Sequence, residues 1–338
     1  MRRVEVSLGA RSYTVAIGAG LLDRAGDLIA PYARDGRIVV VSDSNVWAAQ
    51  GPRLAAASGL EIVPVVVPAG EGSKSWAQLE ALCERLIELD VGRGDTILAF
   101  GGGMVGDLAG FAASVLKRGC AWVQMPTTLL AQVDSSVGGK TAINAAAGKN
   151  LIGAFHQPAA VLIDPSTLDT LPERELRAGY AEVVKYGLIG DSDFFAWCES
   201  NGGALLAGDP EARLHAIETC VRAKAAIVAE DERETTGRRA LLNFGHTLGH
   251  AIEAETGMLH GEAVAIGMAA AFRRSVERGL CPAEDSERAI GHLESVGLPT
   301  STDVPADRLA ARMRHDKKGG TRVLTRGIGK AFLAKVDE

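Results

Sequence analysis

Residues 96–107 read TILAFGGGMVGD, and this stretch decides the expected fold. A short apolar run that ends in glycine is typical of a buried strand in a parallel sheet. Gly101, Gly103 and Gly106 have the GxGxxG spacing, which lets backbone amides at a helix N-terminus approach a pyrophosphate. A tight turn between strand and helix would also need glycines, and no acidic residue ends the next strand to bind a ribose. The stretch therefore predicts a dinucleotide-binding fold, but not in the usual dehydrogenase order.

The first half of the chain repeats this alternation of strands and helices, whereas the second half has helical periodicity almost throughout. Residues 4–8 and 13–17 are predicted to form a hairpin. Buried parallel strands are predicted at residues 37–42, 61–67, 96–100 and 121–125. Helices are predicted at residues 173–190, 209–229, 240–255 and 261–278. A short strand-like tail is predicted at residues 322–333. We expect an α/β, Rossmann-like domain at residues 1–170 and a mostly α-helical domain at residues 171–338, with the site in the cleft between them.

Composition limits the classes of function. The 338 residues are 47% hydrophobic and 23% charged, and their net charge of −6 argues against a general nucleic-acid or membrane-surface role. The chain starts with a strand pattern rather than an apolar signal core, and no apolar run reaches bilayer length. Five scattered cysteines without a CxxC pair fit a reducing cytoplasm. We therefore expect a cytoplasmic protein whose metal sites would use histidine and carboxylate.

Two further segments of the first half have the composition of ligand-binding sites. Asp43 follows a predicted strand and could hydrogen-bond ribose hydroxyls, although a helix N-cap would need the same residue type. Residues 126–150 are rich in small and polar side chains around Lys140 and Lys149. Lysines beside exposed amides suit phosphate and carboxylate oxygens, so we expect a binding loop there rather than a packed element. Residue 134 is Asp, so the segment lacks the glycine of a P-loop.

Three of the seven histidines lie within fifteen residues, in NFGHTLGH at 243–250 and HGE at 260–262. On a helix, His246 and His250 would project from one face, so they could share a metal ion or act as ligand and proton carrier. Thr247 stands where a metalloprotease helix carries its glutamate, which argues against peptide hydrolysis. From spacing alone, two ordinary helix-face histidines remain an equal alternative.

Together with EVVKYG at 182–187 and residues 101–150, these motifs resemble the 3-dehydroquinate synthase family over essentially the whole chain. The resemblance implies conversion of 3-deoxy-D-arabino-heptulosonate 7-phosphate to 3-dehydroquinate and phosphate in the shikimate pathway, which leads to chorismate and the aromatic amino acids. It implies that bound NAD oxidises the substrate transiently, that phosphate is eliminated, and that the ketone is then reduced again. Ring opening and an intramolecular aldol step complete the implied reaction.

The resemblance also implies roles for individual residues. A zinc ion, or cobalt or another divalent ion in its place, would be held by Glu182, His246 and His260. Residues implied in catalysis are Lys140, Lys185, Arg239, Asn243 and His250. Residues implied in binding NAD are Asp43, Asn45, Glu71, Lys74, Gly103, Asp107, Thr127, Thr128, Asp134, Lys140, Lys149 and Thr170. Substrate contacts are implied for Asp134, Asn150, Lys224, Lys318 and Arg118, the last of them across the interface of a homodimer.

Two departures from the family pattern leave assignments open. Residues 231–239 are one residue longer than the common pattern, so either Arg238 or Arg239 could contact substrate, and the shortened segment 315–322 leaves the choice of tail lysine open. The main alternative is another NAD- and metal-dependent sugar-phosphate cyclase, but the residues that would bind a substrate carboxylate are intact. A polyol dehydrogenase would produce net NADH. A ligand-binding regulator would have lost a metal ligand or a lysine, and none is missing.

Overall fold

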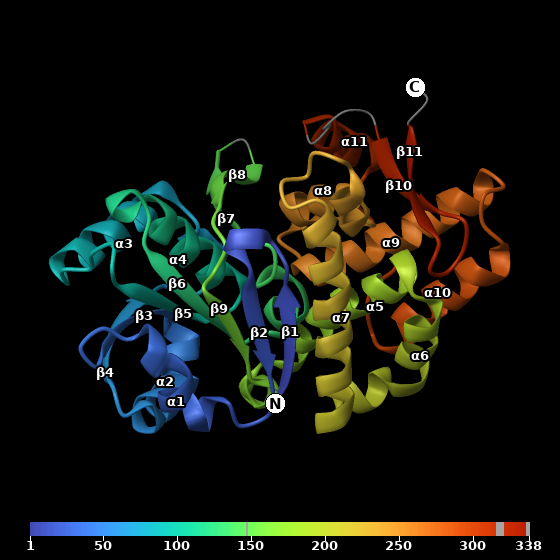
Figure 1. Cartoon of the computed structure of the whole chain (residues 1–338). Helices are drawn as coiled ribbons and strands as arrows, with labels where there is room; N and C mark the ends of the chain where they lie inside the picture. The colour runs from blue at the N-terminus through green and yellow to red at the C-terminus, as the bar shows by residue number, and fades with distance from the viewer. Residues whose placement is uncertain (147, 316–320, 336–338) are drawn as a thin grey trace. The chain divides into compact units, whose positions relative to one another are not determined.

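The chain divides into two compact units, which are described separately (Figure 1). The computed structural model describes residues 1–146, 148–315 and 321–335. Unit 1 comprises Met1–Leu171 and Arg213–Ala229, and unit 2 comprises Pro172–Ala212 and Glu230–Glu338. The segment Arg213–Ala229, which the sequence analysis placed in the second domain, thus packs with the first unit. The domain boundary after residue 170 stays a prediction.

Unit 1 is built around a seven-stranded sheet in the order β1-β2-β9-β6-β5-β3-β4. Apart from the antiparallel pair β1 and β2, neighbouring strands are parallel. The predicted hairpin and the four predicted parallel strands are confirmed, whereas β9 was not predicted. The strands are β1 (Arg2–Val6), β2 (Tyr13–Ile17), β3 (Arg37–Asp43), β4 (Glu61–Val67), β5 (Thr96–Gly101), β6 (Ala121–Pro126) and β9 (Ala160–Ile163).

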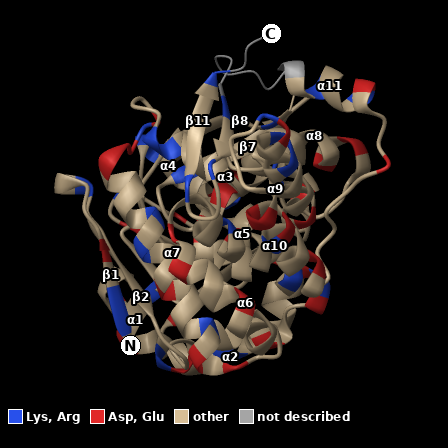
Figure 2. Ribbon diagram, turned by 90° about the vertical axis from the view of Figure 1, so that its right-hand side faces the viewer, with Lys and Arg blue, Asp and Glu red and all other residues tan. Residues whose placement is uncertain are grey.

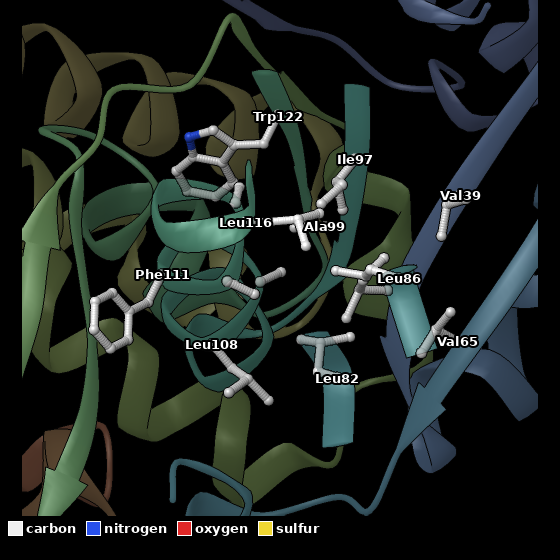
Figure 3. Packing of buried hydrophobic residues seen from close by; sticks show 14 of the residues in the cluster. Val39, Val65, Leu82, Leu86, Ile97, Ala99, Leu108, Phe111, Leu116 and Trp122 are labelled. Carbon is white, nitrogen blue, oxygen red and sulfur yellow. The ribbon is translucent and has the colours of Figure 1, made fainter. Parts of the chain in front are cut away.

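Helices cover both faces of this sheet, so alternate residues of the central strands enter two different cores. Val39 and Ile97 pack with α3 and α4 on one face, which Figure 3 shows around Leu108 and Trp122. Val40 and Leu98 pack with α1 and α2 on the other face. This is a doubly wound arrangement. The helices are α1 (Ala25–Ile29), α2 (Ser44–Ser58), α3 (Trp76–Glu88) and α4 (Gly103–Val115).

Packing within the protein accounts for the glycines between β5 and α4. A Cβ on Gly101 would lie 2.5 Å from Val105 Cγ2, and one on Gly106 would lie 2.8 Å from Gln124 Oε1. Larger residues would push the helix away from the strand. The role of these glycines in binding a pyrophosphate therefore stays a prediction, because the tight turn alone explains them.

The prediction of an unpacked loop at residues 126–150 was wrong. A short π-helix, Ala131–Ser135, is followed by strand β7 (Lys140–Ala145), which pairs antiparallel with β8 (Gly148–Phe155). Ala142 and Ile143 are buried, and β7 packs against α4. The many small residues do not mark a loop but let these strands approach closely, since a Cβ on Gly153 would lie 2.0 Å from the backbone oxygen of Thr141.

Unit 2 is mostly helical, as predicted. Its helices are α5 (Glu173–Gly190), α6 (Ser192–Leu206), α8 (His246–Thr256), α9 (His260–Glu277), α10 (Ala283–Ser295) and α11 (Ala306–His315), and α7 (Pro210–Glu230) spans both units. The sequence analysis missed α6, α10 and α11. It also merged a 3₁₀ turn, Arg238–Asn243, with α8, whereas Gly245 at φ 80° separates the two. The predicted strand-like tail is an antiparallel pair, β10 (Thr321–Thr325) and β11 (Ala331–Lys335).

Positive and negative side chains are interspersed over the helices (Figure 2). Within the described residues, none of the helices combines the length and the apolar composition needed to cross a membrane.

Candidate metal centre and active site

Three helices of unit 2 bring one carboxylate and two imidazoles together. Glu182 lies on α5, His246 begins α8 and His260 begins α9. The Oε1 atom of Glu182 lies 3.4 Å from Nε2 of His246 and 3.3 Å from Nε2 of His260. Glu182 is 1% exposed, so this carboxylate is withdrawn from water. Among the described residues, these three form the one group whose donor atoms lie close enough to hold a metal ion.

The donor set fits a zinc-like ion. A tetrahedral site with bonds of ~2.0–2.1 Å has ligand–ligand distances of ~3.3–3.4 Å, which matches both carboxylate–imidazole distances. The second ring nitrogens are also engaged, because Nδ1 of His246 lies 3.1 Å from the backbone oxygen of Phe244 and Nδ1 of His260 lies 3.2 Å from Glu253 Oε2. Such outer contacts orient metal-binding histidines and fix their tautomers. Both Nε2 atoms are thereby directed at Glu182.

The charges of this group are tightly coupled. Burial would raise the pKa of Glu182, but Lys185 and the two histidines outweigh burial and hold its pKa well below the ordinary value. Burial lowers the pKa of His246 to about 4. Burial would also lower the pKa of His260, but its contacts with Glu182 and Glu253 prevail and raise that pKa to about 9. Without a metal, one proton therefore resides on His260 at neutral pH.

Close helix packing positions the three ligands. A Cβ on Gly261 would lie only 1.8 Å from the backbone oxygen of Ala178, so glycine next to His260 lets α9 lie directly against α5. A Cβ on Gly249 would lie 3.1 Å from the backbone oxygen of Ala263, which brings α8 close to α9. Sequence reasoning predicted the three donor residues but missed both glycines and Glu253, whose carboxylate contacts His260. Helical spacing could have indicated that Glu253 lies near this group, because it follows His246 by seven residues and lies on the same helix face.

Other predicted catalytic residues lie around the three ligands. Lys185, which is 1% exposed, places Nζ 2.5 Å from Oε2 of Glu182. The ring of His250 lies 5.4 Å from that of His246 and 5.8 Å from that of His260, with its side chain exposed. Asn243 is exposed at the end of the 3₁₀ turn before α8. The structure thus brings together a buried lysine and an exposed histidine beside the candidate ligands.

The longer segment at residues 231–239 is held by one carboxylate. Asp231 accepts hydrogen bonds from the backbone amides of Thr235, Thr236 and Arg239 at 2.7, 3.1 and 3.1 Å. Arg239 is 1% exposed, and its Nη1 donates to the backbone oxygen of Glu232 at 2.6 Å. Arg238 instead pairs with Glu230 at 3.1 Å and is largely exposed. Of the two arginines that the sequence left open, Arg239 is the one held inside the unit.

Unit 1 gathers several of the predicted cofactor-binding residues into one polar network. Lys74 is 4% exposed and places Nζ 2.7 Å from Asp107 Oδ2 and 3.4 Å from Glu71 Oε1. Lys74 also donates to Asn150, which was predicted to contact substrate rather than cofactor. Asn144, which the sequence analysis did not single out, donates to Glu71 at 2.9 Å. This network joins the 3₁₀ turn Glu71–Ser73 before α3, helix α4 and the β7–β8 hairpin at the end of the sheet where β5 leads into α4.

A second contact of unit 1 involves α7. Lys224, 6% exposed, donates from Nζ to the backbone oxygen of Asp134 at 2.7 Å and to the carboxylate of the same residue. Both residues were predicted to contact substrate, and 90 residues separate them in the chain. Their contact is one link between α7 and the rest of unit 1.

The other residues predicted to bind NAD differ in their contacts. Asp43 caps α2, since its Oδ1 accepts from the amides of Asn45 and Val46 at 2.9 and 3.1 Å. Asp43 therefore has the N-cap role that the sequence analysis gave as an alternative to ribose binding. The two amide hydrogen bonds use only one of its carboxylate oxygens. Thr170 accepts from Gln50 at 2.9 Å and Thr128 accepts from the amide of Ala131 at 3.2 Å. Thr127 is buried, and its hydroxyl has no hydrogen-bond partner within the described residues.

Several predicted residues are exposed to solvent. Asn45, Arg118, Lys140 and Lys149 all belong to this group. Gly103 begins α4, where a Cβ would lie 3.0 Å from Ser135 Oγ. Lys318 lies outside the described residues.

Two family models and many curated proteins match this chain. Residues 64–178 match the family model described as 3-dehydroquinate synthase N-terminal, and residues 179–319 match the one described as 3-dehydroquinate synthase C-terminal. A 3-dehydroquinate synthase of Zymomonas mobilis is 54% identical over 98% of this chain and 92% of its own length. A 3-dehydroquinate synthase of Rhodospirillum rubrum is 58% identical over 97% of this chain and 90% of its own length. The chain belongs to the 3-dehydroquinate synthase family.

Solved structures of related cyclases have the same fold. A 2-epi-5-epi-valiolone synthase from Streptomyces hygroscopicus, solved with NAD+ and Zn2+, is 31% identical with a TM-score of 0.91 over 98% of this chain and 95% of its own. A 2-deoxy-scyllo-inosose synthase was solved with carbaglucose-6-phosphate, NAD+ and Co2+. It is 28% identical, with a TM-score of 0.87 over 99% of this chain and 96% of its own. The predicted fold class, an α/β dinucleotide-binding part followed by a helical part, is therefore confirmed.

Proposed function

We propose that this chain is an NAD- and zinc-dependent enzyme that converts 3-deoxy-D-arabino-heptulosonate 7-phosphate to 3-dehydroquinate and phosphate. The observation that carries the proposal is the group of Glu182, His246 and His260, with Lys185 beside it, in a chain 51–58% identical to several 3-dehydroquinate synthases. The role of that reaction in making aromatic compounds follows from the family.

The metal is assigned to the three donor atoms of unit 2. A bound divalent ion would supply Lewis-acid chemistry, because its charge lowers the pKa of a substrate hydroxyl. The donor set of two imidazoles and one carboxylate and its tetrahedral spacing suit Zn2+, and related cyclases were solved with Zn2+ or Co2+. Lys185, paired with the far oxygen of Glu182, restrains that carboxylate so that Oε1 faces the histidines.

NAD is assigned to unit 1, and two related cyclases were solved with NAD+. When bound, it would supply reversible hydride transfer. The amides at the start of α4 suit its pyrophosphate, and the second carboxylate oxygen of Asp43 remains for a ribose hydroxyl. The buried hydroxyl of Thr127, at the end of β6, is a polar atom that a ligand would satisfy.

Cationic side chains suit the charges of the substrate, which carries a phosphate and a carboxylate. We assign Lys140, Lys224 and Arg239 to these anionic groups, and Asn150 and Asn243 to hydrogen bonds with substrate oxygens. His250, exposed beside the metal ligands, is placed to hold or pass a proton as phosphate leaves. Lys185 is already paired with Glu182, so its ammonium stabilises negative charge rather than acting as a base.

A homodimer would complete the site through Arg118. This residue is exposed, and it and Lys117 have φ angles of 69° and 51°, a left-handed conformation that is costly for side chains with a Cβ. Exposed apolar side chains occur on α4, which packs against the turn that contains Arg118, and on β8, which packs against α4; they are Val115 at the end of α4 and Leu151 and Phe155 on β8. Strain at an exposed arginine next to an apolar surface supports a contact with a second copy of the chain.

The alternative function, that of a related sugar-phosphate cyclase, differs from the proposed one in its substrate. We therefore propose to measure phosphate release by the NAD- and zinc-loaded protein from the heptulosonate phosphate, from glucose 6-phosphate and from sedoheptulose 7-phosphate. Only the first carries a carboxylate, and we expect turnover with it alone. Release from a sugar phosphate without a carboxylate, and none from the heptulosonate, would move the protein to the sister cyclases.

A further inference from the structure

Unit 2 contains a cavity of about 360 Å³ that is lined by none of the candidate metal ligands. It lies along α9, between that helix, the start of α8, the end of α11 and strand β10. Apolar side chains from three of these elements contribute walls, among them Leu248, Met313 and Leu324, while Arg274 and Arg322 supply charge. A pocket of this size with apolar walls and few polar groups is typical of a small-molecule site.

The two arginines lack the partners that arginines elsewhere in the unit have. Arg308 and Arg312 both pair with Glu255, and Arg273 donates to the backbone oxygen of Thr300 at 2.8 Å. Within the described part of the chain, by contrast, the side chains of Arg274 and Arg322 make neither an ion pair nor a hydrogen bond. Glu277 also lines the cavity but lies beyond ion-pair distance of them.

Like charges accumulate at this end of the cavity. Burial and then the nearby charges of Arg274 and Arg278 lower the pKa of Arg322. Three guanidinium groups near one another repel, and both cavity arginines are partly buried, so each has lost some of its hydration. An anion between them would relieve the repulsion and supply the missing hydrogen-bond acceptors.

The cavity extends away from the metal centre. Arg274 follows His260 by fourteen residues on α9, which is ~21 Å along the helix axis. At its other end the cavity reaches Asn243, which we assign to substrate, so the two sites would share one wall residue. A ligand held by Arg274 and Arg322 is therefore too far from the metal to be the reacting group.

We propose that this cavity binds a small organic acid with an apolar body, whose carboxylate pairs with Arg274 and Arg322 while its body contacts Leu248 and Met313. Two guanidinium groups suit the two oxygens of a carboxylate, and the apolar walls favour a ring or a branched chain over a bare anion. The site is separate from the metal centre, and its occupancy can be measured without turnover, so this inference and the proposed function fail independently.

The test measures equilibrium binding of 3-phenylpropionate to the NAD- and zinc-loaded full chain by calorimetry, with inorganic phosphate as the comparison. We expect saturable binding of the acid that weakens roughly 10-fold or more in Arg274→Gln and in Arg322→Gln, because each removes a charge-assisted contact. The matched control, Arg312→Gln, alters an arginine that is paired with Glu255 and should leave binding unchanged. Met313→Ala should weaken binding of the acid but not of phosphate.

Three results would overturn the inference. One is the absence of saturable binding by the acid, and another is binding that neither arginine substitution weakens. The third is displacement of the acid by substrate together with loss of binding when the metal is removed, since that would place the acid at the metal centre. Stronger binding of phosphate than of the acid, equally sensitive to the two arginines, would contradict the role of the apolar walls. Metal content and thermal unfolding of each variant must match the unaltered chain.

Discussion

At the scale of single residues, Glu253 links the metal centre to the rest of unit 2. Its carboxylate holds Nδ1 of His260 at 3.2 Å and so directs Nε2 toward Glu182. Glu253→Gln keeps the shape but weakens this contact, so we expect the affinity for zinc to fall about 10- to 100-fold. Competition with a chelator measures this affinity. Glu255→Gln, on the same helix but paired with Arg308 and Arg312, is the control that should retain full affinity.

The charge on His260 predicts how metal binding depends on pH. A ligand histidine must be neutral, and the raised pKa of His260, about 9 without metal, means that a proton competes with the ion below that pH. His246, with its pKa lowered to about 4, and the already ionised Glu182 add no such competition. We expect affinity for zinc to fall about tenfold per pH unit from pH ~8.5 to ~6.5, with release of about one proton per ion. Affinity that is constant over this range would show that His260 is already neutral.

At the scale of helices, the contact between α5 and α9 determines whether the three ligands meet. Gly261→Ala would place a methyl group 1.8 Å from the backbone oxygen of Ala178 and force the helices apart. We expect a loss of about 1–3 kcal/mol in the free energy of unfolding and a marked loss of zinc affinity. Gly203→Ala, inside α6 with open space around it, should instead stabilise the chain by ~0.5–1 kcal/mol. Denaturant titrations of both variants with and without zinc test this, and equal zinc affinities would refute the packing argument.

The sequence predicted the central strands and several long helices, and missed β7, β8, β9, α6, α10 and α11. The central parallel strands and α5 were found because apolar runs and helical periodicity are unambiguous there. The β7–β8 hairpin was missed because its glycines and lysines resemble a loop, although Ile143 is fully buried. The three candidate metal ligands were predicted from the family motifs and lie together in the structure, whereas Glu253, Asn144 and Gly261 act through three-dimensional contacts that spacing alone does not reveal.

At the scale of the whole molecule, the proposed dimer makes each active site depend on Arg118 of the other subunit. Arg118→Ala and Glu182→Ala should each abolish most turnover without unfolding the chain. When the two variants are unfolded together and refolded as a mixture, the mixed dimer would contain one site with both residues intact. Random pairing would then restore up to about a quarter of the unaltered activity. If Arg118 acts within its own chain, the mixture stays as inactive as its components, and mixing without refolding is the control.

The central claim is that the enzyme uses NAD without net oxidation of its substrate. We would supply the zinc-loaded protein with 3-deoxy-D-arabino-heptulosonate 7-phosphate and an amount of NAD far below that of substrate, and follow phosphate, 3-dehydroquinate and NADH absorbance together. The account predicts equal amounts of phosphate and 3-dehydroquinate, many turnovers per NAD and no lasting rise of NADH. NADH that accumulates in step with substrate consumption, without phosphate release, would contradict it and identify a dehydrogenase on the same fold.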